Sequence, residues 1–95
     1  MLNIKISFLS LLKDITDQEE ITLSIEENSS IRDILKKLVI KFGKEFEKII
    51  FNFPDNLSKY IIISLNGEDI RSFENLNTFL HDRDEIMLLP AIAGG

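Results

Sequence analysis

The sequence of 95 residues contains no cysteine, which excludes disulfide bonds, thiolate metal sites, iron–sulfur clusters and cysteine nucleophiles. Its one histidine, His81, has no second histidine with which to form a metal site, and it lies in an acidic stretch typical of an exposed turn. No glycine-rich phosphate loop and no Ser-His-Asp set can be assembled. We therefore expect no autonomous active site, no metal and no bound cofactor.

Basic residues and long apolar runs are also scarce. Sixteen acidic and eleven basic residues give a formal net charge of −5, which argues against binding to a nucleic-acid backbone. No apolar run approaches the ~20 residues that span a bilayer, and the N-terminus lacks the charged and apolar blocks of a signal peptide. We expect one cytoplasmic domain that binds neither nucleic acid nor a membrane.

Alternation of apolar and polar residues predicts five strands, at residues 2–9, 19–25, 60–65, 68–71 and 85–89. The link between the first two holds a short helical stretch but is too short for a helical crossover, so these strands should pair antiparallel. Asn66-Gly67 is a strong hairpin signal between the third strand and the fourth.

One amphipathic helix is predicted between Ser30 and Gly43. Ser30 is a good N-cap, Asp33 completes an approximate capping box, and Gly43 is placed to end the helix. The apolar residues between them fall on one stripe: Ile31, Ile34, Leu35, Leu38, Val39 and Phe42. A second short helix is expected at residues 44–51.

Six of the eleven basic residues lie in this helical region, at Arg32, Lys36, Lys37, Lys41, Lys44 and Lys48. We interpret them as the solvated side of the helix, opposite the apolar stripe, with a basic docking patch as the alternative. Further along, residues 72–80 are expected to be irregular. Their apolar side chains should close one end of the core: Phe73, Leu76, Phe79 and Leu80.

The predicted order is strand, strand, helix, strand, strand, strand. One main helix packed on one face of a mixed sheet of about five strands makes an α+β, two-layer domain. This is the β-grasp arrangement of ubiquitin-like proteins. We place the domain at residues 1–89 and a flexible tail at residues 90–95.

The helix covers only one face of the sheet, so the alternation turns Leu9, Met87 and Leu89 outward. In the third strand, either the set at 61, 63 and 65 or the set at 60, 62 and 64 must also face out. Grouped exposed apolar residues usually mark a binding surface. We predict a partner interface here; the alternative is that Leu11, Leu12 or the loop at residues 51–60 covers it.

The tail itself reads Pro90, Ala91, Ile92, Ala93, Gly94 and Gly95. A terminal carboxylate becomes an acyl donor only after another enzyme converts it to an acyl-adenylate with ATP. Because glycine has no Cβ, Gly94-Gly95 can pass through a narrow channel to reach such a site. We expect Gly95 to be the reactive group and the residues before it to form the segment that inserts.

The end of the chain also carries a likeness to a known family. The strand around Asp84-Glu85-Ile86, the apolar pair Leu88-Leu89 and the tail after them resemble the small subunit of molybdopterin synthase. The turn at Asn66-Gly67, the first strand and the helix led by Ser30 match that family in order and spacing. Ala91 stands where the family commonly has a second proline, and Asp82-Arg83-Asp84 replaces its usual Asp-Gly-Asp turn.

The resemblance implies a β-grasp sulfur carrier. Its Gly95 would be adenylated by a ubiquitin-activating-type adenylyltransferase, which uses the ATP, and then converted to a thiocarboxylate. The tail would enter the large subunit of molybdopterin synthase and give sulfur to the pterin precursor of the molybdenum cofactor. Leu9 and Leu89 fall where the family has outward apolar residues that touch the partner.

Three other functions stay open from the sequence. The chain could be a ubiquitin-like modifier joined through Gly95 to lysines of other proteins. It could be a sulfur carrier for thiamine biosynthesis, although those carriers are typically shorter and lack the helical segment at residues 44–51. It could also be an interaction domain whose terminal glycines have no role.

Overall fold

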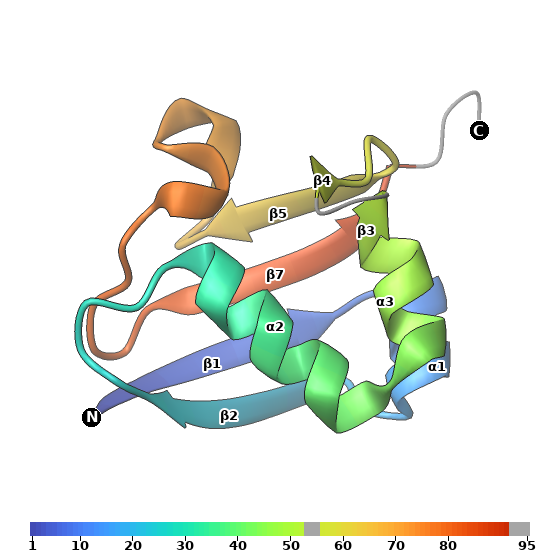
Figure 1. Cartoon of the computed structure of the whole chain (residues 1–95), viewed down its shortest axis with the longest axis horizontal. Helices are drawn as coiled ribbons and strands as arrows, with labels where there is room; N and C mark the ends of the chain where they lie inside the picture. The colour runs from blue at the N-terminus through green and yellow to red at the C-terminus, as the bar shows by residue number, and fades with distance from the viewer. Residues whose placement is uncertain (53–55, 92–95) are drawn as a thin grey trace.

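The computed structural model describes residues 1–52 and 56–91, and its main body is a five-stranded mixed sheet (Figure 1). The strands are β1 (Leu2–Phe8), β2 (Glu20–Ile25), β5 (Ile61–Leu65), β6 (Glu68–Asp69) and β7 (Glu85–Pro90). They lie in the order β2-β1-β7-β5-β6, with β7 parallel to β1 and the other neighbours antiparallel. The last strand of the chain is therefore the middle strand of the sheet.

Helix α2 (Ile31–Phe42) lies across one face of this sheet (Figure 1). Both halves of the predicted capping box are present. The backbone N–H of Ser30 donates to Asp33 Oδ2 at 2.9 Å, and the N–H of Asp33 donates to Ser30 Oγ at 3.4 Å. Gly43 ends the helix with a φ of 88°, a left-handed value that strains any residue with a Cβ.

The core lies between α2 and the inner face of the sheet. The strands bury alternate residues on this face: Ile4, Ile6, Phe8, Ile61, Ile63, Leu65, Ile86 and Leu88. The ring of Phe8 packs edge-to-face against Phe42 and Phe46, with centroid distances of 5.5 and 6.1 Å. The architecture is an α+β, ubiquitin-like β-grasp, which confirms the predicted fold class.

Two short helices and a small hairpin gather at the end of the sheet where β7 ends (Figure 1). They are α1 (Leu11–Thr16), α3 (Lys44–Ile50), β3 (Phe51–Asn52) and β4 (Asn56–Leu57). The β3–β4 pair was not predicted, because two-residue strands leave no alternation to detect. Residues 53–55, between the two strands, lie outside the described residues.

Residues 68–80 differ from their prediction. Strand β6 stops at Asp69, whose side chain accepts the N–H of Arg71 at 2.8 Å, and the chain turns into short 3-10 helices at Ile70–Ser72 and Asn75–Asn77. Leu76 and Leu80 are buried as expected, but Phe73 and Phe79 are 41% and 64% exposed. Phe79 forms a β-bridge with Ser30, so its extended backbone buries Thr78 and Leu80 and turns the ring between them outward.

Candidate functional site

Strand β7 leads the chain out of the domain. Its pairing with β5 continues as far as Pro90, which lies opposite Ile61. The N–H of Ala91 then donates to the carbonyl of Tyr60 at 2.6 Å. On the other side, the N–H of Leu9 donates to the carbonyl of Leu88 at 3.1 Å. The last strand therefore ends at Pro90, one residue later than predicted, and the first two residues of the predicted tail are held against β5.

Pro90 can occupy the middle of the sheet because of this register. In an antiparallel ladder, hydrogen-bonded and non-hydrogen-bonded pairs alternate. Ala91 and Tyr60 form a hydrogen-bonded pair, so the preceding pair, Pro90 and Ile61, is a non-hydrogen-bonded one. Its ring nitrogen is on the β1 side of β7, where β1 has already ended at Phe8. Proline has no N–H with which to continue the β1–β7 ladder beyond the bond from Leu9 to Leu88, whereas the ladder to β5 loses no bond.

An apolar row crosses the outer face of the sheet beside this exit. Leu89 of β7 is paired with Ile62 of β5. Leu9 lies on the other side of Leu89, because each directly follows one member of the parallel pair Phe8 and Leu88. We call Leu9, Leu89 and Ile62 the outer apolar row; all three are half-buried. The exposed Met87, at 40%, lies one row further from the exit.

The structure decides which residues of β5 face outward. Ile61, Ile63 and Leu65 are buried, and Ile62 and Ser64 belong to the outer face. Tyr60, just before β5, is 57% exposed, and Leu11 at the start of α1 is 50% exposed. The sequence left the β5 alternatives open and named neither Tyr60 nor Leu11 as a site residue, because nothing local specifies how β5 faces the helix.

The outer face becomes charged with distance from the exit. Lys5 Nζ lies 3.4 Å from a carboxylate oxygen of Glu20 and 3.9 Å from one of Glu85. Ser7 and Ser64 flank Met87 between the charged residues and the apolar row. On this face, burial by a partner therefore lowers the free energy most at the part beside Pro90 and Ala91, where the side chains are apolar.

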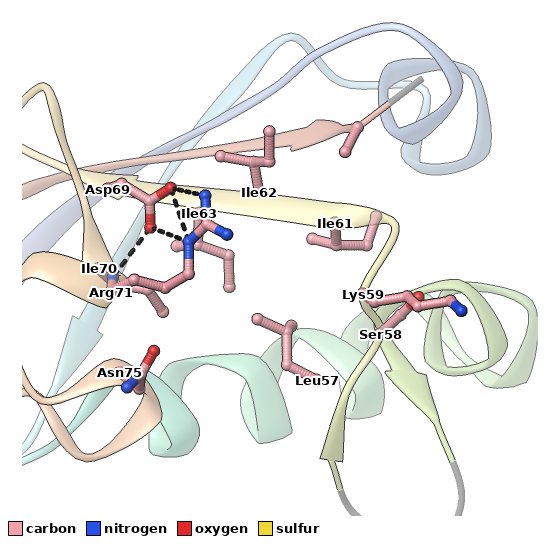
Figure 2. Close-up of a pocket in the computed structure, with 11 residues that line it drawn as sticks. Leu57, Ser58, Lys59, Ile61, Ile62, Ile63, Asp69, Ile70, Arg71 and Asn75 are labelled. Carbon is pink, nitrogen blue, oxygen red and sulfur yellow. Dashed lines mark hydrogen bonds and ion pairs between the residues drawn. The ribbon is translucent and has the colours of Figure 1, made fainter. Parts of the chain in front are cut away.

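A groove runs along the free edge of β5 and reaches Ala91 (Figure 2). It exists because β6 pairs only with Ser64 and Leu65, which leaves Ile61–Ile63 without a strand on that side among the described residues. Two of its polar residues pair with each other: Arg71 and Asp69 face one another, with Nη2 of Arg71 2.6 Å from Oδ2 of Asp69. These hydrogen bonds hold the pKa of Asp69 below its ordinary range. The groove thus offers the backbone edge of β5 for contact with a partner.

One of the remaining ionisable groups, Asp84, has a structural role. Asp84 is buried and accepts the N–H of His81 at 2.7 Å and the side-chain amide of Asn66 at 2.9 Å, which joins the start of β7 to the β5–β6 turn. His81 is exposed. Within residues 1–52 and 56–91, no group of acidic, histidine or cysteine side chains could hold a metal ion, and no helix is long and apolar enough to cross a membrane.

Among the predicted site residues, the structure brings Leu9, Met87, Leu89, Pro90 and Ala91 to one end of the sheet. Ile92, Ala93, Gly94 and Gly95 lie outside the described residues. The contact of the first group with a partner stays a prediction.

Comparison with known proteins identifies the family. The sequence profile of the ThiS family matches residues 6–95, which is nearly the whole chain. The chain belongs to the ThiS family. This ThiS-family chain is also 33% identical, over 69 residues, to a protein from Archaeoglobus fulgidus named as a sulfur carrier; the match covers 73% of this chain and 77% of that protein.

Two solved structures share the fold. Small archaeal modifier protein 1 from Methanosarcina acetivorans superposes with a TM-score of 0.86 and 33% identity, over 100% of this chain and 98% of that one. A molybdopterin converting factor, subunit 1, from Pyrococcus furiosus has a TM-score of 0.77 and covers 97% of this chain and 100% of that one. At 16% identity, the second shows the fold alone. The chain is thus a ubiquitin-like sulfur carrier, a small protein that is not itself a catalyst.

Proposed function

We propose that this carrier bears sulfur as a thiocarboxylate on Gly95 and acts as the small subunit of a molybdopterin synthase, giving that sulfur to the pterin precursor of the molybdenum cofactor. A ubiquitin-activating-type adenylyltransferase would prepare the end with ATP. The large subunit of the synthase would then receive the tail.

The observation that carries the proposal is the position of the exit. The middle strand of a rigid sheet holds the chain as far as Ala91, beside the outer apolar row. Four residues follow, and a fully extended chain of four residues reaches about 14 Å. A partner that covers the row could therefore receive Gly95 in a site well below its own surface.

The chemistry needs only the end of this chain and a catalytic partner. The Gly95 carboxylate attacks the α-phosphorus of ATP and releases pyrophosphate, which leaves an acyl-adenylate. Hydrosulfide then attacks the acyl carbon, AMP departs with one of the former carboxylate oxygens, and the C-terminus is left as a thiocarboxylate. Gly94 and Gly95 suit this chemistry because neither has a Cβ that would obstruct entry into the active site of the adenylyltransferase or of the large subunit.

Two features support the choice of acceptor. The tail and the strand before it resemble the small subunit of molybdopterin synthase in residue order. The fold is shared, along nearly the full length of both chains, with a protein named as a molybdopterin converting factor subunit.

Intact-mass measurement on protein isolated from its native cells tests the proposal. We expect a fraction of the molecules to be heavier by the difference between sulfur and oxygen, with the change confined to the C-terminal peptide. A variant with one extra alanine after Gly95 is the matched control and should never carry the shift. If that variant supports molybdenum-cofactor synthesis as well as the natural chain, the proposal fails.

A second candidate is a protein modifier joined to lysines through Gly95. The full-length match, at 33% identity, to a protein named as a small archaeal modifier favours it. Tryptic digestion of the same cells separates the two functions, because a modifier yields target peptides in which residues 84–95, the segment after Arg83, are joined through Gly95 to a lysine. Such peptides, without the sulfur shift, would replace the first proposal by the second.

A further inference from the structure

We propose that the solvent-facing side of α2 is a second docking surface, which binds an acidic segment of a partner protein. The surface, called the lysine face, consists of Lys36, Lys37 and Lys41 around Ile40. It belongs to the helical layer, on the opposite side of the sheet from the outer apolar row (Figure 1). The proposal does not depend on the chemistry of the tail.

The charge of the chain is strongly divided between its layers. Residues 31–50, which hold α2 and α3, contain six of the eleven basic residues but only three of the sixteen acidic ones. The remainder is therefore far more acidic than the net charge of −5 suggests. An acidic segment approaching this protein is repelled by most of its surface and attracted by the lysine face, which both steers and orients it.

The lysines of α2 differ from three other basic residues in their partners. Lys5, Lys13 and Arg71 each lie within 4 Å of a carboxylate oxygen. Within the described ranges 1–52 and 56–91, by contrast, no ion pair joins Lys36, Lys37 or Lys41 to a carboxylate. Asp33, the acidic residue of α2, already accepts hydrogen bonds in the capping box. Of the three lysines, Lys37 shares a surface hollow with Glu26, Glu27 and Asp33, so the positive charge of the lysine face is strongest at Lys36 and Lys41.

One apolar side chain, that of Ile40, lies among these lysines. Ile40 is 84% exposed, on a helix whose other isoleucines and leucines are fully buried. Helical spacing places Lys36 and Lys37 one turn before Ile40, and Lys41 one turn after Lys37. An isoleucine surrounded by lysines matches a segment whose carboxylates flank one apolar side chain. A nucleic-acid backbone would satisfy the lysines and leave Ile40 in water.

The placement has a consequence for the carrier. Because the lysine face and the outer apolar row lie on opposite layers, one partner can hold the domain while another receives the tail. A partner bound to the lysine face alone leaves the outer face and the β5 edge free for the partner that receives the tail.

A peptide titration followed by amide NMR of the full chain tests the inference. The probe is a short synthetic peptide with glutamate and aspartate on both sides of one central leucine; a matched peptide carries serine at the centre. We expect saturable shifts at Lys36, Lys37, Ile40 and Lys41, and weaker affinity as salt is added. The leucine peptide should bind several-fold more tightly than the serine peptide to the natural chain, and equally to the Ile40→Ser variant.

Paired lysine variants supply the electrostatic control. Replacing both Lys36 and Lys37 by Gln should weaken the leucine peptide about fivefold, since exposed ion pairs contribute modestly. Replacing Lys13 and Lys59 by Gln makes the same change in net charge elsewhere and should leave affinity nearly unchanged. Equal losses in both double variants, shifts that map to another face, or preferential binding of single-stranded oligouridylate would each overturn the proposal.

Discussion

The two faces of β7 are built from alternate residues of one strand and have different surroundings. On the inner face, Ile86 and Leu88 are 1% and 0% exposed beneath the helical layer. On the outer face, Met87 is 40% exposed and Leu89 is half-buried beside the tail. Apolar character alone therefore does not reveal the role of a residue here, because the same kind of side chain serves the core on one face and is available for binding on the other.

This comparison separates stability from binding. Burial of apolar area stabilises a fold only where folding itself removes the side chain from water. The inner face has obtained that free energy within the domain. The outer apolar row would obtain it only when a partner covers the row. Variants on the two faces should consequently affect different measurements.

The largest expected effect is on the free energy of unfolding, from a substitution in the core beneath the inner face of the sheet. Leu38→Ala removes a fully buried side chain of α2 and should lower the free energy of unfolding by about 2–5 kcal/mol. Met87→Ala, on the exposed side, should change it by less than about 1 kcal/mol. Denaturant unfolding measures both; similar losses in the two variants would show that the outer face is part of the core.

The next effect is on binding. Leu89→Asp places a carboxylate in the outer apolar row and should weaken binding to the large subunit at least about tenfold, because the partner would bury that charge. Thr22→Asp is the control, since it adds the same charge to the outer face on the edge strand β2. Isothermal titration gives both affinities. If Leu89→Asp binds as the natural chain does, the row is not the interface.

A smaller effect is expected where the chain leaves the outer face for α1. Ser10 has φ 52° and ψ −127°, angles that glycine adopts freely and that a Cβ makes costly. Ser10→Gly should raise stability by about 1 kcal/mol, while Gly43→Ala, at φ 88°, should lower it by a similar amount. Thermal unfolding tests the pair. A destabilised Ser10→Gly variant would mean that the serine hydroxyl, not the backbone strain, dominates.

The smallest effect is at the sheet edge, outside both faces. Arg71 holds the pKa of Asp69 below its ordinary value of 3.8, so Arg71→Gln should bring that pKa back up. Because the folded-state pKa is depressed, the pair stabilises the protein above the ordinary value and loses its contribution as pH falls through the lowered one. NMR titration of the Asp69 carboxyl follows the shift. An unchanged pKa in the variant would assign it to the backbone N–H instead.

Much of the fold could be predicted because its signals are local. The capping box of Ser30 and Asp33, the turn at Asn66-Gly67 and the apolar stripe of α2 each involve residues a few positions apart. The errors, by contrast, arise where contacts between distant residues decide the packing. Phe79 was expected in the core on its apolar character, but a backbone bridge to Ser30, far away in sequence, set which of its neighbours turned inward.

The candidate site was predictable in part for the same reason. Alternation in β7 indicated that Met87 and Leu89 face away from the helix, and the residue types of the tail pointed to Gly95. The sequence could not show whether Ile61 or Ile62 faces outward, since both sets of alternate residues in that strand contain apolar side chains. Only the pairing of Ile62 with Leu89 resolves it.

By itself, the sequence determined the strands β1, β2, β5 and β7 and the capped helix, and it predicts the chemistry of the diglycine end, because these depend on residue type and short-range spacing. The tertiary structure alone decided that the last strand lies in the middle of the sheet and that its exit is beside Leu9, Leu89 and Ile62. It also decided that the lysines of α2 surround an exposed Ile40 without a carboxylate partner among the described residues. The physical reason is that strand register and helix orientation follow from contacts between residues distant in the chain, which no local pattern contains.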